Sequence, residues 1–206
     1  MITMNWTDNH CHLPDDMDLA SEVVQNAKDS DVHRLIDVGT SITHSVKCIA
    51  RANEFEGVWA TVGVHPHDAK DGIQGLEQLV TSPKVVAVGE CGLDYHYDNS
   101  PRDTQREVFT QQIQLAHQYD LPLVIHTREA WPDTFDILDS EGVPRKTVFH
   151  CFTGGPAEAQ AGLQRGAYLS FSGIITFPNA PELREAAALT PSDRYMVETD
   201  APYLAP

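Results

Sequence analysis

The stretch Val85-Val86-Ala87-Val88-Gly89-Glu90-Cys91-Gly92-Leu93-Asp94 begins as an apolar, β-branched run and includes two acidic residues. Its first part, Val85–Gly89, predicts a strand, and such continuous hydrophobicity is typical of a parallel strand covered on both faces. Glu90 and Asp94 follow at once, where functional side chains stand in barrels of parallel strands. The stretch therefore predicts an α/β fold with a polar site at one end of its strands.

Similar apolar runs recur along the whole chain, and helix-like segments separate them roughly every 30 residues. The expected strands are Asn5–Asp8, Arg34–Val38, Val58–Val64, Val85–Gly89, Leu123–His126, Thr147–His150, Ala167–Phe171 and Arg194–Thr199. Alternation of this kind indicates right-handed βαβ units and a parallel sheet. Eight strands favour a TIM-type (β/α)8 barrel over a doubly wound open sheet.

The length of 206 residues predicts one domain, 1–206, although it is close to the lower limit of about 200 residues for such a barrel. The eighth expected strand ends near Thr199, and the sequence ends at Pro206. No residues remain for the final C-terminal helix of the barrel. Two interpretations stay open: the chain is C-terminally truncated, or another segment or subunit covers the seam between the first and eighth strands.

The net charge of −16 excludes a broad basic surface for nucleic acid, because such a protein repels phosphate backbones. It does not exclude a local phosphate site built on metal ions. No apolar run approaches the roughly 18 residues that span a membrane, and the N-terminus lacks the features of a signal peptide. We expect a cytoplasmic protein whose four cysteines are reduced and pack in the core.

Histidine and carboxylate residues cluster at the ends of the expected strands. They are His10 and His12, Glu90, His126, His150 and Asp200. Each has an ordinary structural explanation: surface histidines, core histidines, an ion pair between Glu90 and Arg128, or a turn cap at Asp200. Their gathering at one rim of the barrel predicts a metal site instead. His10 and His12 lie two apart in an extended segment, so both rings point to the same side.

Four histidines with two carboxylates suit Zn²⁺, Mn²⁺ or Fe²⁺, whereas Mg²⁺ favours more oxygen ligands. Two such ions about 3.5–4 Å apart would generate a hydroxide nucleophile. We expect Asp200 to bind one ion and to accept a proton from the attacking water. A carboxylate at Glu90, following a glycine at a buried strand end, could bridge the ions.

Arg128 and His65 are the candidates for contacts with a substrate phosphate. Arg128 could hold a phosphate bidentately, or it could form an ion pair with Glu129 or Glu90. His65 could contact a phosphate, or it could be a turn residue before Pro66. Weaker candidates near the same rim are His67, Asp94, Tyr95 and His96.

These motifs resemble the TatD family of metal-dependent deoxyribonucleases, within the amidohydrolase-like barrels. The matching segments span the chain in order: 10–13 (HCHL), 63–67 (GVHPH), 89–95 (GECGLDY), 122–128 (PLVIHTR), 150–154 (HCFTG) and 198–206 (ETDAPYLAP). The resemblance implies a TIM-type barrel with two divalent metal ions (Mg²⁺, Mn²⁺ or Zn²⁺). It implies His10, His12, Glu90, His126, His150 and Asp200 as ligands, with Glu90 bridging and with Glu90 and Asp200 catalytic. Family members usually continue for roughly one further β/α unit after the last motif.

The resemblance also implies an activity, the hydrolysis of phosphodiester bonds in DNA, often as a 3′→5′ exonuclease, with DNA or nucleic-acid ends as substrate. Two alternatives stay open. One is a metal-dependent hydrolase of a small ester, lactone or amide; many such barrels use a modified lysine where this chain has Glu90. The other is a non-catalytic fragment that binds metal or a partner.

Overall fold

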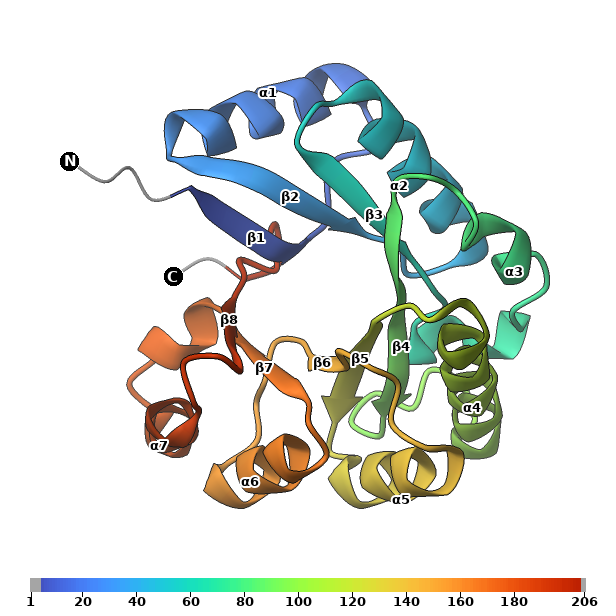
Figure 1. The fold of residues 1–206 in the computed structure, drawn as a ribbon, viewed down its shortest axis with the longest axis vertical. Helices are drawn as coiled ribbons and strands as arrows, with labels where there is room; N and C mark the ends of the chain where they lie inside the picture. The colour runs from blue at the N-terminus through green and yellow to red at the C-terminus, as the bar shows by residue number, and fades with distance from the viewer. Residues whose placement is uncertain (1–4, 205–206) are drawn as a thin grey trace.

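A single sheet of eight parallel strands curves into a nearly closed barrel in the computed structural model, which describes residues 5–204 (Figure 1). The strands neighbour one another in chain order from β1 to β8. They are β1 (Trp6–Cys11), β2 (Val32–Val38), β3 (Val58–Val62), β4 (Val85–Asp94), β5 (Leu123–Arg128), β6 (Val148–Phe149), β7 (Tyr168–Phe171) and β8 (Tyr195–Val197). The predicted (β/α)8 barrel is confirmed.

Helices connect consecutive strands and surround the sheet (Figure 1). They are α1 (Met17–Asp29), α2 (Ile42–Glu54), α3 (Leu76–Leu79), α4 (Arg102–Tyr119), α5 (Trp131–Glu141), α6 (Pro156–Gln164) and α7 (Pro181–Leu189), with 3₁₀ segments η1 (Pro66–Asp71) and η2 (Gly173–Thr176). Local sequence starts several of them: Asp16 caps α1 by accepting hydrogen bonds from the amides of Asp18 and Leu19. Within the described residues no helix follows β8, as expected from the sequence.

Strand boundaries differ from those predicted, and the largest differences fall at the polar ends. β4 continues from Gly89 to Asp94, β5 continues from His126 to Arg128, and β1 continues from Asp8 to Cys11. The prediction ended each strand where its apolar run ended, but pairing with a neighbouring strand continues through polar residues. β3, β6, β7 and β8 are shorter than predicted, and β2 begins two residues earlier, at Val32. The candidate residues His10, Glu90 and His126 therefore lie inside strands.

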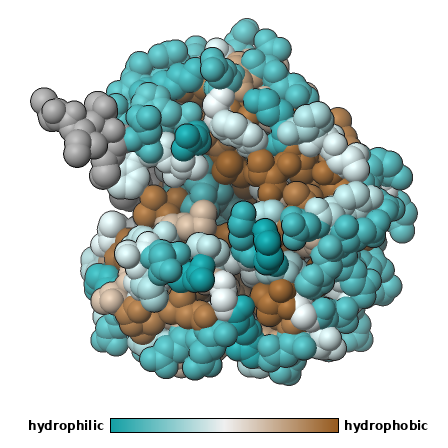
Figure 2. All heavy atoms as spheres, in the orientation of Figure 1, coloured by the Kyte–Doolittle hydropathy of each residue, from teal (hydrophilic) through white to brown (hydrophobic). Residues whose placement is uncertain are grey.

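The core is apolar and fills the space inside the barrel and beneath the helices. Phe109 and Ile113 of α4 are fully buried, as their helical spacing predicts, and Phe149 of β6 contacts Trp131 of α5. Figure 2 shows hydrophobic side chains gathered toward the middle of one face and hydrophilic ones around its periphery. Among residues 5–204, no helix is both long enough and apolar enough to cross a membrane.

β1 and β8 do not pair as strands in the described residues; the side-chain amide of Asn9 donates to the carbonyl of Val197, and the other closing bonds involve the segment that follows β8. Figure 1 shows the segment after β8 running beside β1. The amide of Asp200 donates to the carbonyl of His10 (2.9 Å), and the amide of His12 donates to the carbonyl of Ala201 (2.8 Å). The carboxylate of Asp8 accepts hydrogen bonds from the amide and the hydroxyl of Thr199. Three of the predicted metal ligands, His10, His12 and Asp200, thus also take part in closing the barrel through their backbones.

Candidate metal centre

Two glycines let β4 approach β5 closely where the predicted ligands lie. Gly89 and Gly92 flank the Glu90–Cys91 pair and have φ angles of 137° and 129°, a region that favours glycine. A Cβ atom on Gly89 would lie 2.5 Å from the carbonyl oxygen of Val124, and one on Gly92 would overlap the carbonyl oxygen of His126. Both glycines are therefore required to keep Glu90 beside the histidine of β5.

Glu90 lies at the centre of a ring of histidines, and its two oxygens face different members of the ring. Oε1 lies 2.9 Å from Nε2 of His150, 3.1 Å from Nδ1 of His126 and 3.3 Å from Nε2 of His65. Oε2 lies 3.5 Å from Nε2 of His10. The carboxylate is 4% exposed. The Glu90 carboxylate can therefore bridge two sets of ligands.

The seam side of the site holds His10, His12 and Asp200. Oδ1 of Asp200 lies 3.5 Å from Nε2 of His12 and 3.8 Å from Nε2 of His10. The rings of His10 and His12 lie 5.2 Å apart, so the two histidines converge as their spacing predicts. His10 also stacks on His150 at 3.8 Å, which joins this side to the Glu90 side.

Asp94 orients His126 from behind. Its Oδ2 lies 3.1 Å from Nε2 of His126 and 3.0 Å from Nε2 of His67, while its Oδ1 accepts the amides of His96 and Tyr97. A carboxylate on one ring nitrogen of a histidine leaves the other nitrogen free for a metal and fixes the ring orientation. The structure thus places the weaker candidate Asp94 directly behind a predicted ligand.

Two of the three remaining predicted histidine ligands, His12 and His150, are also oriented through one ring nitrogen. Nδ1 of His12 lies 3.0 Å from the carbonyl oxygen of Val38, so its Nε2 faces Asp200. Nδ1 of His150 lies 3.3 Å from Oε1 of Glu198, which also accepts the amide of Cys151 at 2.7 Å. Sequence reasoning gave Glu198 no role, because its partner His150 is 48 residues away. The only signal available was its place in the motif that contains Asp200.

The protonation states suit a cluster of this kind. Burial alone would raise the pKa of Glu90, but the positive charge of His150 and a hydrogen bond from His126 hold it well below its ordinary value. Burial would also raise the pKa of Asp200, and a hydrogen bond from His12 and the charge of His150 lower it. Both carboxylates are therefore ionised at neutral pH, as metal ligands must be.

The donor set fits divalent metal ions. His10 is fully buried, yet neither of its ring nitrogens has a hydrogen-bond partner. A buried polar atom without a partner is costly, and a metal ion would satisfy it. In the described part of the chain, three groups have ligand atoms within 4.8 Å of one another: His10, His150 and Asp200; His10, His12 and Glu90; and His65, Glu90 and His126. The structure thus brings together all six predicted ligands, and it adds His65 to them.

His65 and Arg128, the two predicted phosphate contacts, lie in different surroundings. Burial lowers the pKa of His65 to about 4, and its Nε2 points at Glu90. His65 therefore offers a neutral ring to the centre as well as to a substrate. Arg128 is exposed, and its guanidinium lies 4.8 Å over the ring of Tyr97. Neither suggested ion pair forms in the part of the chain described: Glu129 pairs with His96 instead, at 2.7 Å.

The remaining sequence candidates lie outside the ligand groups. His67 contacts Asp94, and the hydroxyl of Tyr95 donates to Asp133. The four cysteines are free thiols, three of them buried, and none contributes to a ligand group of residues 5–204. Burial raises the pKa of Cys91 well above its ordinary value, so this thiol stays protonated beside Glu90. The prediction that the cysteines pack rather than bind metal agrees with these positions.

Comparison with known proteins agrees with the motifs and the fold. The family described as "TatD related DNase" matches residues 7–206. The uncharacterized metal-dependent hydrolase YabD of Bacillus subtilis is 40% identical over 97% of this chain and 81% of its own length. The 3′-5′ ssDNA/RNA exonuclease TatD of Cronobacter sakazakii is 38% identical, over 90% of this chain and 73% of its own length.

A solved structure supports the same conclusion. The crystal structure of YjjV, a TatD homologue from Escherichia coli, superposes with a TM-score of 0.89 at 28% identity. The match covers 98% of this chain and 82% of that one. The chain therefore belongs to the TatD family of metal-dependent hydrolases.

Proposed function

We propose that this protein hydrolyses phosphodiester bonds at the ends of DNA, as a 3′→5′ exodeoxyribonuclease that uses two divalent metal ions. The observation that carries the proposal is the division of the Glu90 carboxylate, whose Oε2 faces His10 while Oε1 faces His126 and His150. One carboxylate between two sets of histidines is what a dinuclear hydrolase needs. The name of the Cronobacter relative, an exonuclease on single-stranded DNA and RNA, supports the choice of substrate.

The proposed ligands divide into two sets that share Glu90. His10, His12 and Asp200 would hold one ion on the seam side. His126 and His150, with His65 beside them, would hold the other. Ions bound there would activate a water and neutralise the charge of the phosphate oxygens.

The chain's own residues have distinct proposed roles around those ions. Asp200 is ionised and lies at the edge of the centre, so its carboxylate can accept the proton of the attacking water. The guanidinium of Arg128 forms no ion pair with the carboxylates of residues 5–204, so it can hold a phosphate with two parallel hydrogen bonds. Asp94 and Glu198 keep His126 and His150 in their orientations. The negative net charge of −16 favours engagement of one chain end over binding along a strand.

End-labelled single-stranded DNA tests the proposal directly. Incubation with the protein and Mn²⁺ or Mg²⁺ is expected to give a ladder of products shortened stepwise from the 3′ end, and chelation is expected to abolish it. Labelling the other end distinguishes 3′→5′ from 5′→3′ removal. Internal cuts would contradict the exonuclease assignment. A protein that binds metal and hydrolyses an uncharged ester or lactone but leaves every oligonucleotide intact would contradict the nuclease assignment.

A further inference from the structure

Tyr97 is an exposed aromatic residue at the rim of the candidate centre, and the mechanism proposed above gives it no role. Its side chain is 54% exposed, which is a large apolar surface to leave in water. The guanidinium of Arg128 lies over the ring at 4.8 Å, and the ring of His67 meets it edge-on at 5.4 Å. Tyr97 and Arg128 form what we call the rim stack.

The rim stack is tied to the predicted ligands rather than free to move independently. Oδ1 of Asp94 accepts the amide of Tyr97 at 3.0 Å, while Oδ2 of the same carboxylate lies 3.1 Å from His126. Arg128 is two residues beyond His126 and pairs with Asp94 in the β4–β5 ladder. One buried carboxylate therefore holds both the histidine of the centre and the tyrosine of the rim.

We infer that the rim stack binds an unpaired nucleobase adjacent to the phosphate that is hydrolysed. The inference rests on the proposed function, which brings a nucleic-acid end to the centre. Exposed aromatic rings and guanidinium planes are the groups on which proteins stack single-stranded bases. A base within a duplex is already stacked and presents no free face, so the rim stack would select unpaired ends.

The charge of the protein strengthens this argument. With 30 acidic and 14 basic residues, the surface gains little from general attraction to phosphates. Arg128 is one of those few basic residues, and within residues 5–204 its guanidinium forms no ion pair with a carboxylate. A neutral base on an aromatic ring gives affinity that does not require a basic surface. Stacking would thus provide affinity for nucleic acid that long-range electrostatic attraction does not provide in this acidic protein.

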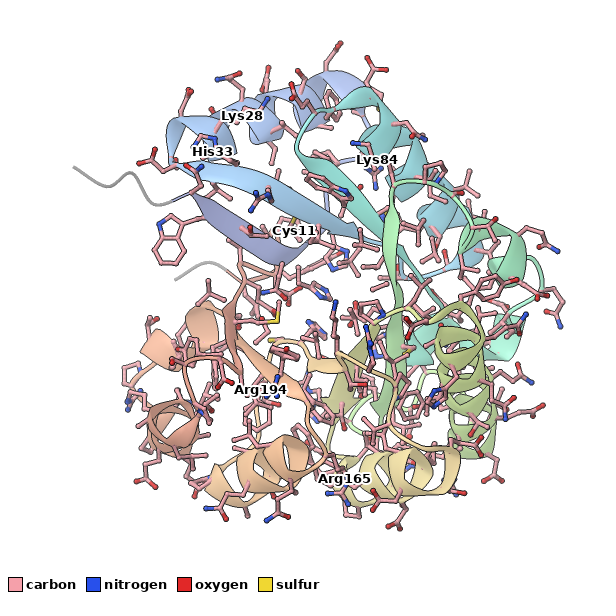
Figure 3. All side chains as sticks on the ribbon, viewed as in Figure 1. Cys11, Lys28, His33, Lys84, Arg165 and Arg194 are labelled. Atoms are coloured by element: carbon pink, nitrogen blue, oxygen red, sulfur yellow. The ribbon has the colours of Figure 1, made fainter. Side chains whose placement is uncertain are left out.

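The chain contains a matched control for the rim stack. Arg194 lies over the ring of Tyr168 at 4.8 Å, the same separation as in the rim stack. Tyr168 begins β7 and Arg194, labelled in Figure 3, precedes β8, so this pair lies at the opposite end of the barrel from the centre. A tyrosine-to-alanine change there removes the same kind of contact without touching the site.

The experiment compares wild type with Tyr97→Ala, Tyr97→Phe and Tyr168→Ala on single-stranded oligonucleotides that carry one abasic residue at successive positions from the 3′ end. On intact DNA with Mn²⁺, Tyr97→Ala is expected to lower kcat/KM roughly 5- to 150-fold. Tyr97→Phe keeps the aromatic ring and Tyr168→Ala does not change the rim stack, so the kcat/KM of both variants is expected to stay near the wild-type value. At one abasic position the difference between wild type and Tyr97→Ala is expected to vanish.

A binding measurement without turnover completes the test. With Ca²⁺ in place of Mn²⁺, an oligonucleotide with 2-aminopurine at the position identified above should lose fluorescence on wild type and keep it on Tyr97→Ala. Equal kcat/KM for wild type and Tyr97→Ala, or an equal loss at every abasic position, would overturn the stacking site while leaving the nuclease assignment intact. Wild-type protein that neither binds nor cleaves the intact oligonucleotide would overturn both.

Discussion

The two sides of the candidate centre are built differently. On the β4–β5 side, strand pairing runs through the predicted ligands, with Gly92 opposite His126 and Asp94 opposite Arg128. On the seam side, β1 and β8 are not paired as strands, and the backbone hydrogen bonds that close the seam run from Asp200 to His10 and from His12 to Ala201. One side carries its proposed ligands on a continuous ladder, whereas on the other side the backbones of the proposed ligands help to close the barrel.

This difference implies a difference in energetics. A ladder holds its ligands whether or not metal is bound, because many backbone hydrogen bonds must break together before it opens. In the described residues, two backbone hydrogen bonds and the side chains of Asp8 and Asn9 join the two edges of the seam, so its opening breaks fewer hydrogen bonds than the opening of a strand ladder. We therefore expect metal binding to be linked to barrel closure at the seam and to be largely independent of it at β4–β5.

The largest expected effect comes from Glu90→Ala, because Glu90 faces both sides. The change removes the shared carboxylate and is expected to lower hydrolysis roughly 10⁴-fold, as when one member of a catalytic unit is lost. Bound metal, measured by elemental analysis, should fall from two ions to one or none. Asp139→Ala, which removes an exposed carboxylate paired with Arg165, is the control. Folding is checked by circular dichroism, and activity close to wild type would rule out the dinuclear centre.

Asp94→Asn is expected to weaken metal binding on the β4–β5 side alone. The change removes the charge behind His126 but keeps the size of the side chain, and loss of such an orienting partner typically costs 10- to 100-fold in metal affinity or activity. Calorimetric titration should show one weakened ion and one ion of unchanged affinity. An equal loss of affinity for both ions would mean that the two sides do not bind metal independently.

Asp8→Ala is expected to weaken the seam. Its carboxylate accepts the amide of Thr199 at 3.0 Å and the hydroxyl of Thr199 at 2.5 Å, and hydrogen bonds to charged groups contribute about 1.5–3 kcal/mol. Burial raises the pKa of Asp8, so the cost of burying this carboxylate offsets part of the stabilisation from its hydrogen bonds. We therefore expect Asp8→Ala to lower the free energy of unfolding, measured in urea, by about 2 kcal/mol.

A control for this prediction lies on the β5 strand. Thr127→Val removes a hydroxyl that contacts Thr134 at 2.9 Å, while Thr134 keeps its bond to the carbonyl of Ala130. We expect the free energy of unfolding to fall by less than about 1 kcal/mol, since an apolar group of the same shape replaces the hydroxyl. A loss as large as that of Asp8→Ala would show that the paired side is no more robust than the seam.

The same contrast explains what the sequence could predict. The eight strands followed from apolar runs, and five strand ends with a histidine or carboxylate indicated the centre, so the barrel was predictable and the six proposed ligands lie together. The predicted end of β4 was wrong because the apolar run stops at Gly89 while pairing with β5 continues to Asp94.

Residues whose role depends on a distant partner were not predictable. Glu198 supports His150, and Tyr97 lies against Arg128, but neither pair is close in sequence. The closure of the seam by the ligand residues also escaped prediction, because periodicity describes each strand and not the hydrogen bonds beyond its end. Side-chain chemistry indicated the candidate ligands, and only the three-dimensional structure showed which of these residues join β1 to the segment after β8.

Hydrogen exchange tests the difference between the two sides at single residues. If metal binding and seam closure are linked, Mn²⁺ at about 100 times its dissociation constant adds up to about 2.7 kcal/mol to the closed state. The amides of His12 and Asp200, which form the closing bonds, should then exchange up to roughly 100-fold more slowly than after chelation. Leu93 and Thr127, paired in the β4–β5 ladder, already require a larger opening and should change less. Equal slowing at all four residues would mean that the barrel opens as one unit, and the distinction between its two sides would then be one of geometry alone.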